Sequence, residues 1–108
     1  MLVEGSKAEI FDKATSDKID TIELRGEPLA LAISNNRRQV VTAIRNILFT
    51  DIYHYQKTAQ GSWDMKMLQR LQQPPRALVW EEADDPRYPP VELVITHGDG
   101  GVEREWVE

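Results

Sequence analysis

The sequence contains no cysteine among its 108 residues. This absence excludes disulfides, thiolate metal sites and cysteine nucleophiles, and it is typical of proteins of a reducing compartment. No apolar run approaches the roughly 20 residues that a membrane-spanning helix needs, and the N-terminus lacks the basic and apolar regions of a secretory signal. We therefore expect a cytoplasmic protein that does not engage a membrane.

Histidine is also scarce, since His54 and His97 are the two in the chain. A structural zinc site takes about four ligands, so without cysteine the ligands would have to come from distant segments. The glycine-rich stretch 97–101 precedes a strand pattern rather than a helix, which predicts a hairpin turn and not a phosphate-binding loop. We predict no metal, no cofactor and no catalytic residue.

The composition suits one globular domain over residues 1–108. Hydrophobic residues make up 41% of the chain and charged residues 29%, which is too apolar for a disordered chain. The net charge of −5 is uneven: residues 35–78 hold seven Lys or Arg and two Asp or Glu, whereas residues 81–108 hold nine acidic and two basic residues. Two solvated faces are the ordinary interpretation, and a surface that attracts a charged partner is the alternative.

Alternating apolar residues predict several strands, with turn residues between them. The segment 38–45 is the ambiguous one. Its β-branched residues favour a strand, while Asn36 as an N-cap and the spacing of Val40 and Ile44 also fit a helix. We predict a strand there, entered through an Asn35-Asn36 turn that sets Leu31 opposite Val40. The other predicted strands are 19–24, 29–33, 77–80 and the hairpin 91–95 with 102–107.

Two helices are expected. Residues 63–73 carry a capping Ser62, helix-forming residues and a terminating Pro74-Pro75. A short helix at 6–15 follows from Ser6 with Glu9 three residues later, and a frayed terminus is its alternative. The predicted fold class is therefore α+β: an antiparallel, twisted sheet of about five strands, one packed helix at 63–73 and a short N-terminal helix.

Basic and aromatic residues make up the candidate binding set. Cations that follow phosphates and rings that stack on bases are the combination used by proteins that bind single-stranded nucleic acid. The negative net charge and the lack of an RNA-binding signature oppose that interpretation. The set comprises Arg37, Arg38, Arg45, Tyr53, Tyr55 and Trp63.

Three functions remain open at this point. The leading hypothesis is a non-catalytic binding or accessory module that acts on a macromolecular partner, a protein or a second copy, through sheet and loop surfaces. Direct nucleic-acid binding through the candidate set is the second. The third is a small enzyme with a site around His54 and Asp51, joined by Arg37 or Arg38, which would need a pocket with convergent polar groups.

Residues 22–44 resemble a pattern of a small β-rich bacterial domain of unknown function. In that pattern a strand is followed by a Gly-x-Pro turn, a second strand, an Arg-Arg pair, and Val and Ile on a third strand. Gly26 and Pro28 match the turn, Arg37 and Arg38 match the pair, and Val41 and Ile44 match the third strand. Asp51, Tyr53 and Tyr55 lie where that family shows an acidic residue followed by tryptophans, and 93–100 resembles its later strand and turn. Such domains are sometimes found near translesion-polymerase genes, so the resemblance implies a non-enzymatic accessory role in DNA repair.

Overall fold

The computed structural model describes residues 2–12, 14–85 and 87–106. These residues form ten β-strands and contain no helix, so none of them forms a helix that could cross a membrane. The strands are β1 (Leu2–Glu4), β2 (Lys7–Phe11), β3 (Lys18–Glu23), β4 (Pro28–Ile33), β5 (Gln39–Arg45), β6 (Thr50–Lys57), β7 (Trp63–Leu71), β8 (Ala77–Glu81), β9 (Glu92–Thr96) and β10 (Val102–Trp106).

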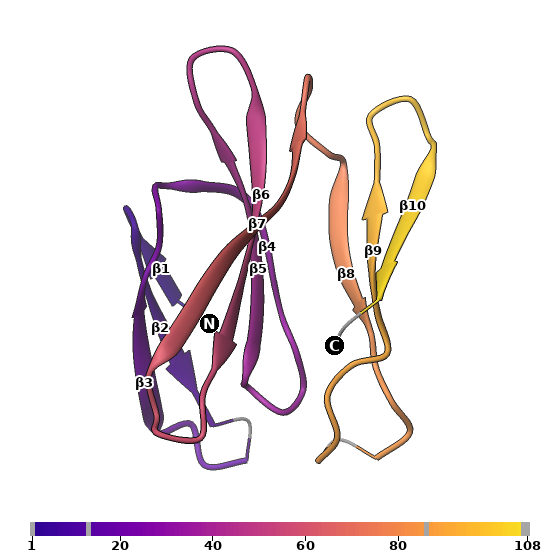
Figure 1. The fold of residues 1–108 in the computed structure, drawn as a ribbon. Coiled ribbons are helices and arrows are strands. Elements are labelled where there is room, and N and C mark those ends of the chain that lie inside the picture. The colour runs from indigo at the N-terminus through magenta and orange to yellow at the C-terminus, as the bar shows by residue number, and fades with distance from the viewer. Residues whose placement is uncertain (1, 13, 86, 107–108) are drawn as a thin grey trace.

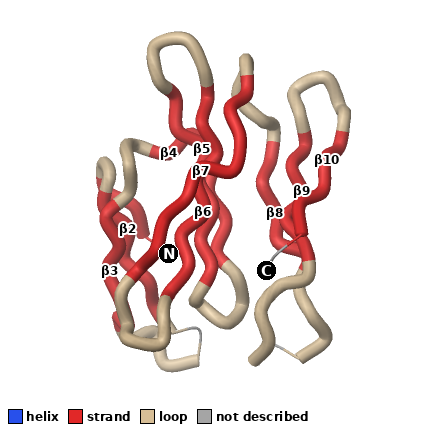
Figure 2. Tube along the Cα trace, viewed as in Figure 1, coloured by secondary structure: helices blue, strands red, loops and turns tan. Residues whose placement is uncertain are grey.

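The strands form three antiparallel sheets that are stacked as layers. Sheet A has the order β1-β2-β3, sheet B the order β4-β5-β6-β7 and sheet C the order β10-β9-β8. Figure 1 shows sheet A on the left, sheet B in the middle and sheet C on the right. The predicted α+β class and the single sheet of about five strands are therefore wrong. Figure 2 shows strands and loops, and no helix, among the described residues.

Sheet B is the middle layer, and its strand β5 is buried on both faces. Six of the seven β5 residues are buried, and only Arg45 at its end is exposed. Val40 packs in a cluster with sheet A, whereas Val41 packs in a cluster with sheet C. Strands covered on both faces are apolar at successive positions, which explains why 38–45 lacks a clear alternation. The strand prediction for this segment is confirmed.

Two hydrophobic cores fill the spaces between the layers. The core between sheets A and B contains Ala8, Ile10, Ile22, Leu24, Val40 and Tyr55. The core between sheets B and C contains Val41, Ala43, Ile52, Leu78, Trp80, Leu93 and Ile95. Adjacent residues of one strand thus serve different cores, because side chains alternate across a sheet.

The helix predicted at 63–73 is wrong, because these residues form β7. This strand pairs with β6 along its whole length, from Trp63 opposite Lys57 to Leu71 opposite Thr50, with one irregularity near Leu68. Helix propensity is a weak local preference that tertiary context overrides. Here the hydrogen-bonding groups of β6 need a partner strand, and β7 supplies it from an exposed edge position.

The helix predicted at 6–15 is also wrong. Lys7–Phe11 form β2, which pairs with β1 and β3. Ala8 and Ile10 are both buried, so the apolar period here is two residues rather than three or four. Ser6 does not cap a helix: its carbonyl oxygen accepts a hydrogen bond from the Leu24 N–H at 2.7 Å. Lys13, which the prediction included, lies outside the described residues.

The predicted turn between β4 and β5 is longer than expected. Leu31 lies opposite Thr42, and Val40 lies opposite Ile33, so the register predicted from a two-residue loop is wrong. The extra residues make a wider loop in which Arg37 has φ of +61°, a left-handed conformation that is uncommon for a long side chain. The Arg37 N–H donates to the Ser34 carbonyl oxygen at 3.0 Å and holds this turn.

The final hairpin is confirmed. β9 and β10 pair without a register shift from Thr96 opposite Val102 to Glu92 opposite Trp106. The connecting turn places Gly100 at φ of +96°, a conformation that glycine adopts without steric cost. Val107, the predicted end of the last strand, lies outside the described residues. The strands predicted at 19–24, 29–33 and 77–80 are confirmed as β3, β4 and β8.

Candidate functional site

The predicted basic and aromatic set does not form one surface. Arg37 and Arg38 precede β5, whereas Arg45 ends it, so about 20 Å of strand separates them. Tyr55 is only 2% exposed, in the core between sheets A and B, and Tyr53 packs against the same cluster. The rings therefore do not offer the open faces on which bases stack.

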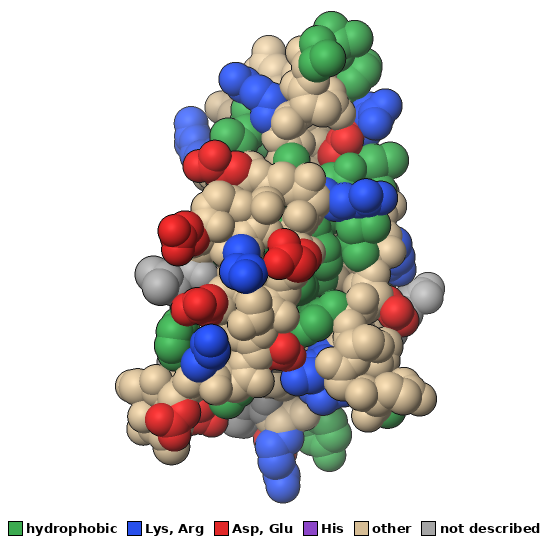
Figure 3. All heavy atoms as spheres, turned by 90° about the vertical axis from the view of Figure 1, so that its left-hand side faces the viewer, with side chains coloured by type: hydrophobic (Ala, Val, Ile, Leu, Met, Phe, Trp, Pro, Cys, Tyr) green, Lys and Arg blue, Asp and Glu red, His purple; other side chains and the backbone are tan. Residues whose placement is uncertain are grey.

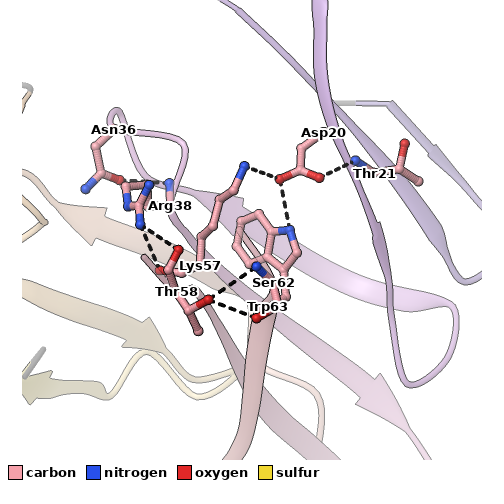
Figure 4. A network of polar contacts seen from close by, with 8 residues as sticks. All are labelled: Asp20, Thr21, Asn36, Arg38, Lys57, Thr58, Ser62 and Trp63. Carbon is pink, nitrogen blue, oxygen red and sulfur yellow. Dashed lines mark hydrogen bonds and ion pairs between the residues drawn. The ribbon is translucent and has the colours of Figure 1, made fainter. Parts of the chain in front are cut away.

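Arg38 is tied to the backbone of the β6–β7 turn (Figure 4). Its Nη2 donates to the carbonyl oxygens of Lys57 and Thr58, at 3.2 and 3.0 Å. The side chain of Asn36 accepts a hydrogen bond from the Arg38 N–H at 2.9 Å. The guanidinium thus joins two loops at the same end of sheet B, and part of its hydrogen-bonding capacity is already used.

Trp63 also takes part in a contact between sheets, with Asp20 of β3 as its partner. The Trp63 indole N–H donates to Asp20 Oδ2 at 3.0 Å, and Lys57 Nζ lies 2.6 Å from the same oxygen. Burial raises the pKa of Asp20, but the hydrogen bonds from Lys57, the Thr21 N–H and Trp63 outweigh it, so this pKa lies below its ordinary value. Figure 4 shows this bridge from sheet A to the β6–β7 turn.

The two residues of the enzyme hypothesis lie on opposite faces of sheet B. His54 pairs with Val41, which faces sheet C, and Asp51 pairs with Ile44 on the other face. Arg70 Nε donates to Asp51 Oδ1 at 2.8 Å, and Asn46 Nδ2 donates to Oδ2 at 2.8 Å. The Arg70 hydrogen bond chiefly lowers the pKa of Asp51. Asp51 is therefore an ionised anchor rather than a base beside His54.

His54 is buried between sheets B and C. Its Nε2 is within hydrogen-bond distance of Gln39 Oε1, and its ring lies 5.6 Å from the Trp80 ring, centroid to centroid. Burial chiefly, with the positive charge of Lys66, lowers the pKa of His54 to about 4. The imidazole is therefore neutral near pH 7, with Nε2 protonated toward the Gln39 oxygen and Nδ1 left as the acceptor.

A cleft lies beside His54, between the edge strands β7 and β10. It encloses about 100 Å³, and its far end is spanned by a hydrogen bond from Gln69 Nε2 to Glu103 Oε2 at 2.7 Å. At the floor, the Trp80 indole N–H donates to the Ala32 carbonyl oxygen at 3.1 Å, which joins β8 to β4. Trp106, on the rim, is 76% exposed. The cleft is lined by His54, Lys66, Leu68, Trp80, Glu105 and Trp106.

The tip of the β5–β6 hairpin is a second exposed apolar feature. Ile47 is 98% exposed and Leu48 is 74% exposed. Asn46 fixes their backbone, because its Oδ1 accepts hydrogen bonds from the Leu48 and Phe49 N–H groups at 3.0 and 2.8 Å. This hairpin forms the upper end of sheet B in Figure 1, and hydrophobic side chains gather at the upper end of the face in Figure 3. Lower on that face, acidic and basic side chains are interspersed.

Sequence reasoning missed the residues that build the cleft. Trp80 was assigned only to an apolar strand, although the alternation of Leu78 and Trp80 places both on one face. Glu105 and Trp106 are adjacent in the last strand, so their side chains leave it on opposite faces. What no local pattern shows is that β10 lies opposite β7, because that depends on how sheets B and C stack.

The double variant Arg37→Ala, Arg38→Ala tests whether these arginines bind nucleic acid. Their guanidinium groups donate to backbone carbonyl oxygens, so we expect the free energy of unfolding to fall by about 1–2 kcal/mol. Retention of a single-stranded oligonucleotide at low salt should be the same for wild type and variant. Salt-dependent retention of the wild type that the double variant loses would contradict this assignment.

The described part of the chain contains no group of three or more His, Asp and Glu side chains arranged to hold a metal ion. The resemblance to a small β-rich bacterial domain stays a prediction. Comparison with protein-family models, with curated proteins and with solved structures finds no match to this chain.

Proposed function

We propose that this protein is a non-catalytic module that binds a protein partner through the cleft between β7 and β10. The observation that supports it is the exposed Trp106 beside a preformed hollow lined by both apolar and polar side chains. Tryptophan is enriched among the residues that dominate binding energy, and such residues are found next to well-packed pockets. A chain without cysteine suits a reducing compartment, and we propose the cytoplasm as the place of action.

The chemistry of the cleft favours binding over catalysis. His54 is neutral and faces Gln39 rather than a carboxylate, so it lacks the charged partner that orients a general base. The hollow of about 100 Å³ is smaller than the clefts of several hundred Å³ that enclose small-molecule substrates. It matches a single side chain of a protein partner.

Selection from a random peptide library displayed on phage tests this function. Peptides enriched on the wild-type protein should bind the Trp106→Ala variant about tenfold more weakly, because an aromatic anchor of this kind contributes more than 1 kcal/mol. Ile47→Ser is the matched control, since Ile47 is also an exposed hydrophobic residue, at 98%, but lies at the far end of sheet B. It should leave affinity unchanged. Failure to enrich any peptide, or enriched peptides that ignore Trp106→Ala, would overturn the proposal.

A further inference from the structure

Strand β10 is an edge strand whose free side carries unpaired backbone groups. Among the described residues it pairs with β9 alone, and this pairing has no register shift. The His97 N–H donates to the Gly101 carbonyl oxygen at 2.8 Å. Hydrogen-bonded and non-hydrogen-bonded pairs alternate along an antiparallel ladder. Since His97 and Gly101 form a hydrogen-bonded pair, Val102, Arg104 and Trp106 belong to the non-hydrogen-bonded pairs. Their N–H and C=O groups therefore point away from β9. Figure 1 shows β10 at the outer margin of sheet C.

The other edges carry features that hinder the pairing of a further strand. β4 begins with Pro28 and has a register shift there, and β7 is irregular near Leu68. β1 spans only three residues, and β3 is bridged to the β6–β7 turn through Asp20. β8 lies along β4, where Asn35 N–H donates to Glu82 Oε1 at 2.9 Å.

The side chains of β10 define what could pair with it. Arg104, on the outer face, is neutralised by Glu81 and Glu92, whose carboxylate oxygens lie 2.6 and 2.8 Å from its Nη1. The inner face, toward sheet B, carries the two carboxylates of Glu103 and Glu105. Glu103 accepts a hydrogen bond from Gln69 Nε2 at 2.7 Å and lies 3.1 Å from His97 Nε2. Among the described side chains, no Lys or Arg forms an ion pair with either carboxylate. Residues 81–108 as a whole hold nine acidic and two basic residues, so a strand added here meets a negative surface.

The same carboxylates oppose pairing of β10 with a second copy of itself. Antiparallel pairing about a twofold axis centres on one residue. A register centred on Arg104 sets Glu103 opposite Glu105 of the other copy, and registers centred on Glu103 or Glu105 set that glutamate opposite its own copy. Like charges directly opposite each other destabilise a strand pair. The edge therefore discriminates against self-pairing and favours a strand of opposite charge.

We propose that β10 binds an extended basic peptide segment of a partner protein as an added antiparallel strand. This inference rests on the proposed function and deepens it. Lys or Arg at alternate positions of the segment lies next to Glu103 and Glu105. The residue between these two cations lies against Arg104, and apolar residues on either side of them lie against Val102 and Trp106. One inner side chain enters the cleft, with its aliphatic stem on Leu68 and its cation on the Glu105 side. Backbone hydrogen bonds provide affinity in this mode and alternate side chains provide specificity.

Three blocked synthetic peptides test the proposal with the wild-type protein. Lys-Val-Lys-Val-Lys should bind in a fluorescence anisotropy titration and shift the amide resonances of Val102, Arg104 and Trp106. Glu-Val-Glu-Val-Glu should bind at least about tenfold more weakly, because its charges oppose those of β10. The basic peptide with N-methyl groups at the pairing positions should also lose about tenfold, since it lacks the donors that an added strand needs. Equal affinity of all three would overturn strand addition.

Variants separate this inference from the proposed function. The double change Glu103→Gln, Glu105→Gln should weaken the basic peptide several-fold and flatten its salt dependence, while Ile47→Ser should leave both unchanged. Unfolding curves of the variants confirm that each is folded. If library peptides still require Trp106 but the basic peptide does not bind, the strand-addition proposal fails and the binding module stands. If no library peptide binds either, both fail.

Discussion

Replacing Trp80 by alanine should lower the free energy of unfolding by about 3–5 kcal/mol, the cost of removing a large aromatic side chain from a packed core. Trp80 is 7% exposed, belongs to the core between sheets B and C, and donates to the Ala32 carbonyl oxygen of β4. Its loss removes a contact that joins β8 to β4 as well as apolar burial. Urea unfolding followed by far-ultraviolet circular dichroism measures the change.

Trp106→Ala is the matched control, because it removes the same side chain from an exposed position. We expect it to change the free energy of unfolding by no more than about 0.5 kcal/mol, as surface substitutions do. If both substitutions cost the same, Trp80 is not a core residue and sheets B and C do not stack as described.

Acidification should destabilise the protein through His54, whose pKa is about 4 in the folded chain and 6.5 ordinarily. Between these two values the unfolded chain binds a proton that the folded chain does not. The free energy of unfolding therefore decreases as the pH falls from 6.5 to 4, and this contribution is fully present above pH 6.5. The whole difference amounts to about 3 kcal/mol, and urea unfolding at a series of pH values measures it.

The variant His54→Gln should abolish most of this pH dependence, and His97→Gln should retain it. The carboxylates with lowered pKa values are present in both proteins and therefore do not obscure the comparison. Asp20 and Asp51 have an ordinary value of 3.8, below the His54 window, and Glu92 has an ordinary value of 4.5, inside it. Parallel pH profiles for wild type and His54→Gln would show that His54 is not buried as a neutral group.

Strands were predicted most accurately from the sequence where a strand has one buried face or ends in a glycine turn. The β9–β10 hairpin combines alternating residues with Gly100 in a turn, so its local pattern and its tertiary environment agree. β5 was ambiguous because sheets A and C cover its two faces. Burial on both faces removes the alternation that identifies a strand, and β-branched side chains were the remaining signal.

Segment 63–71 could not be assigned correctly from local propensity. Its residues favour a helix and Pro74 follows, but the unpaired groups of β6 require a strand partner there. The predicted grouping of the candidate site residues was wrong for a related reason. Arg37 and Arg45 are close in sequence, but β5 lies between them and places them at opposite ends of the strand. Asp51 and His54 are separated by an odd number of strand positions, which places them on opposite faces of the sheet.

The central claim is that β5 lies in a middle layer with a sheet on each side. Nuclear Overhauser effects between methyl groups test it most directly, because they report contacts within a few ångströms. The structure predicts effects from Val40 to the sheet A residues Ala8 or Ile10, and from Val41 to the sheet C residues Leu93 or Ile95. Effects from both valines to one sheet alone, or sequential amide contacts typical of a helix through residues 39–45, would contradict the three-layer fold.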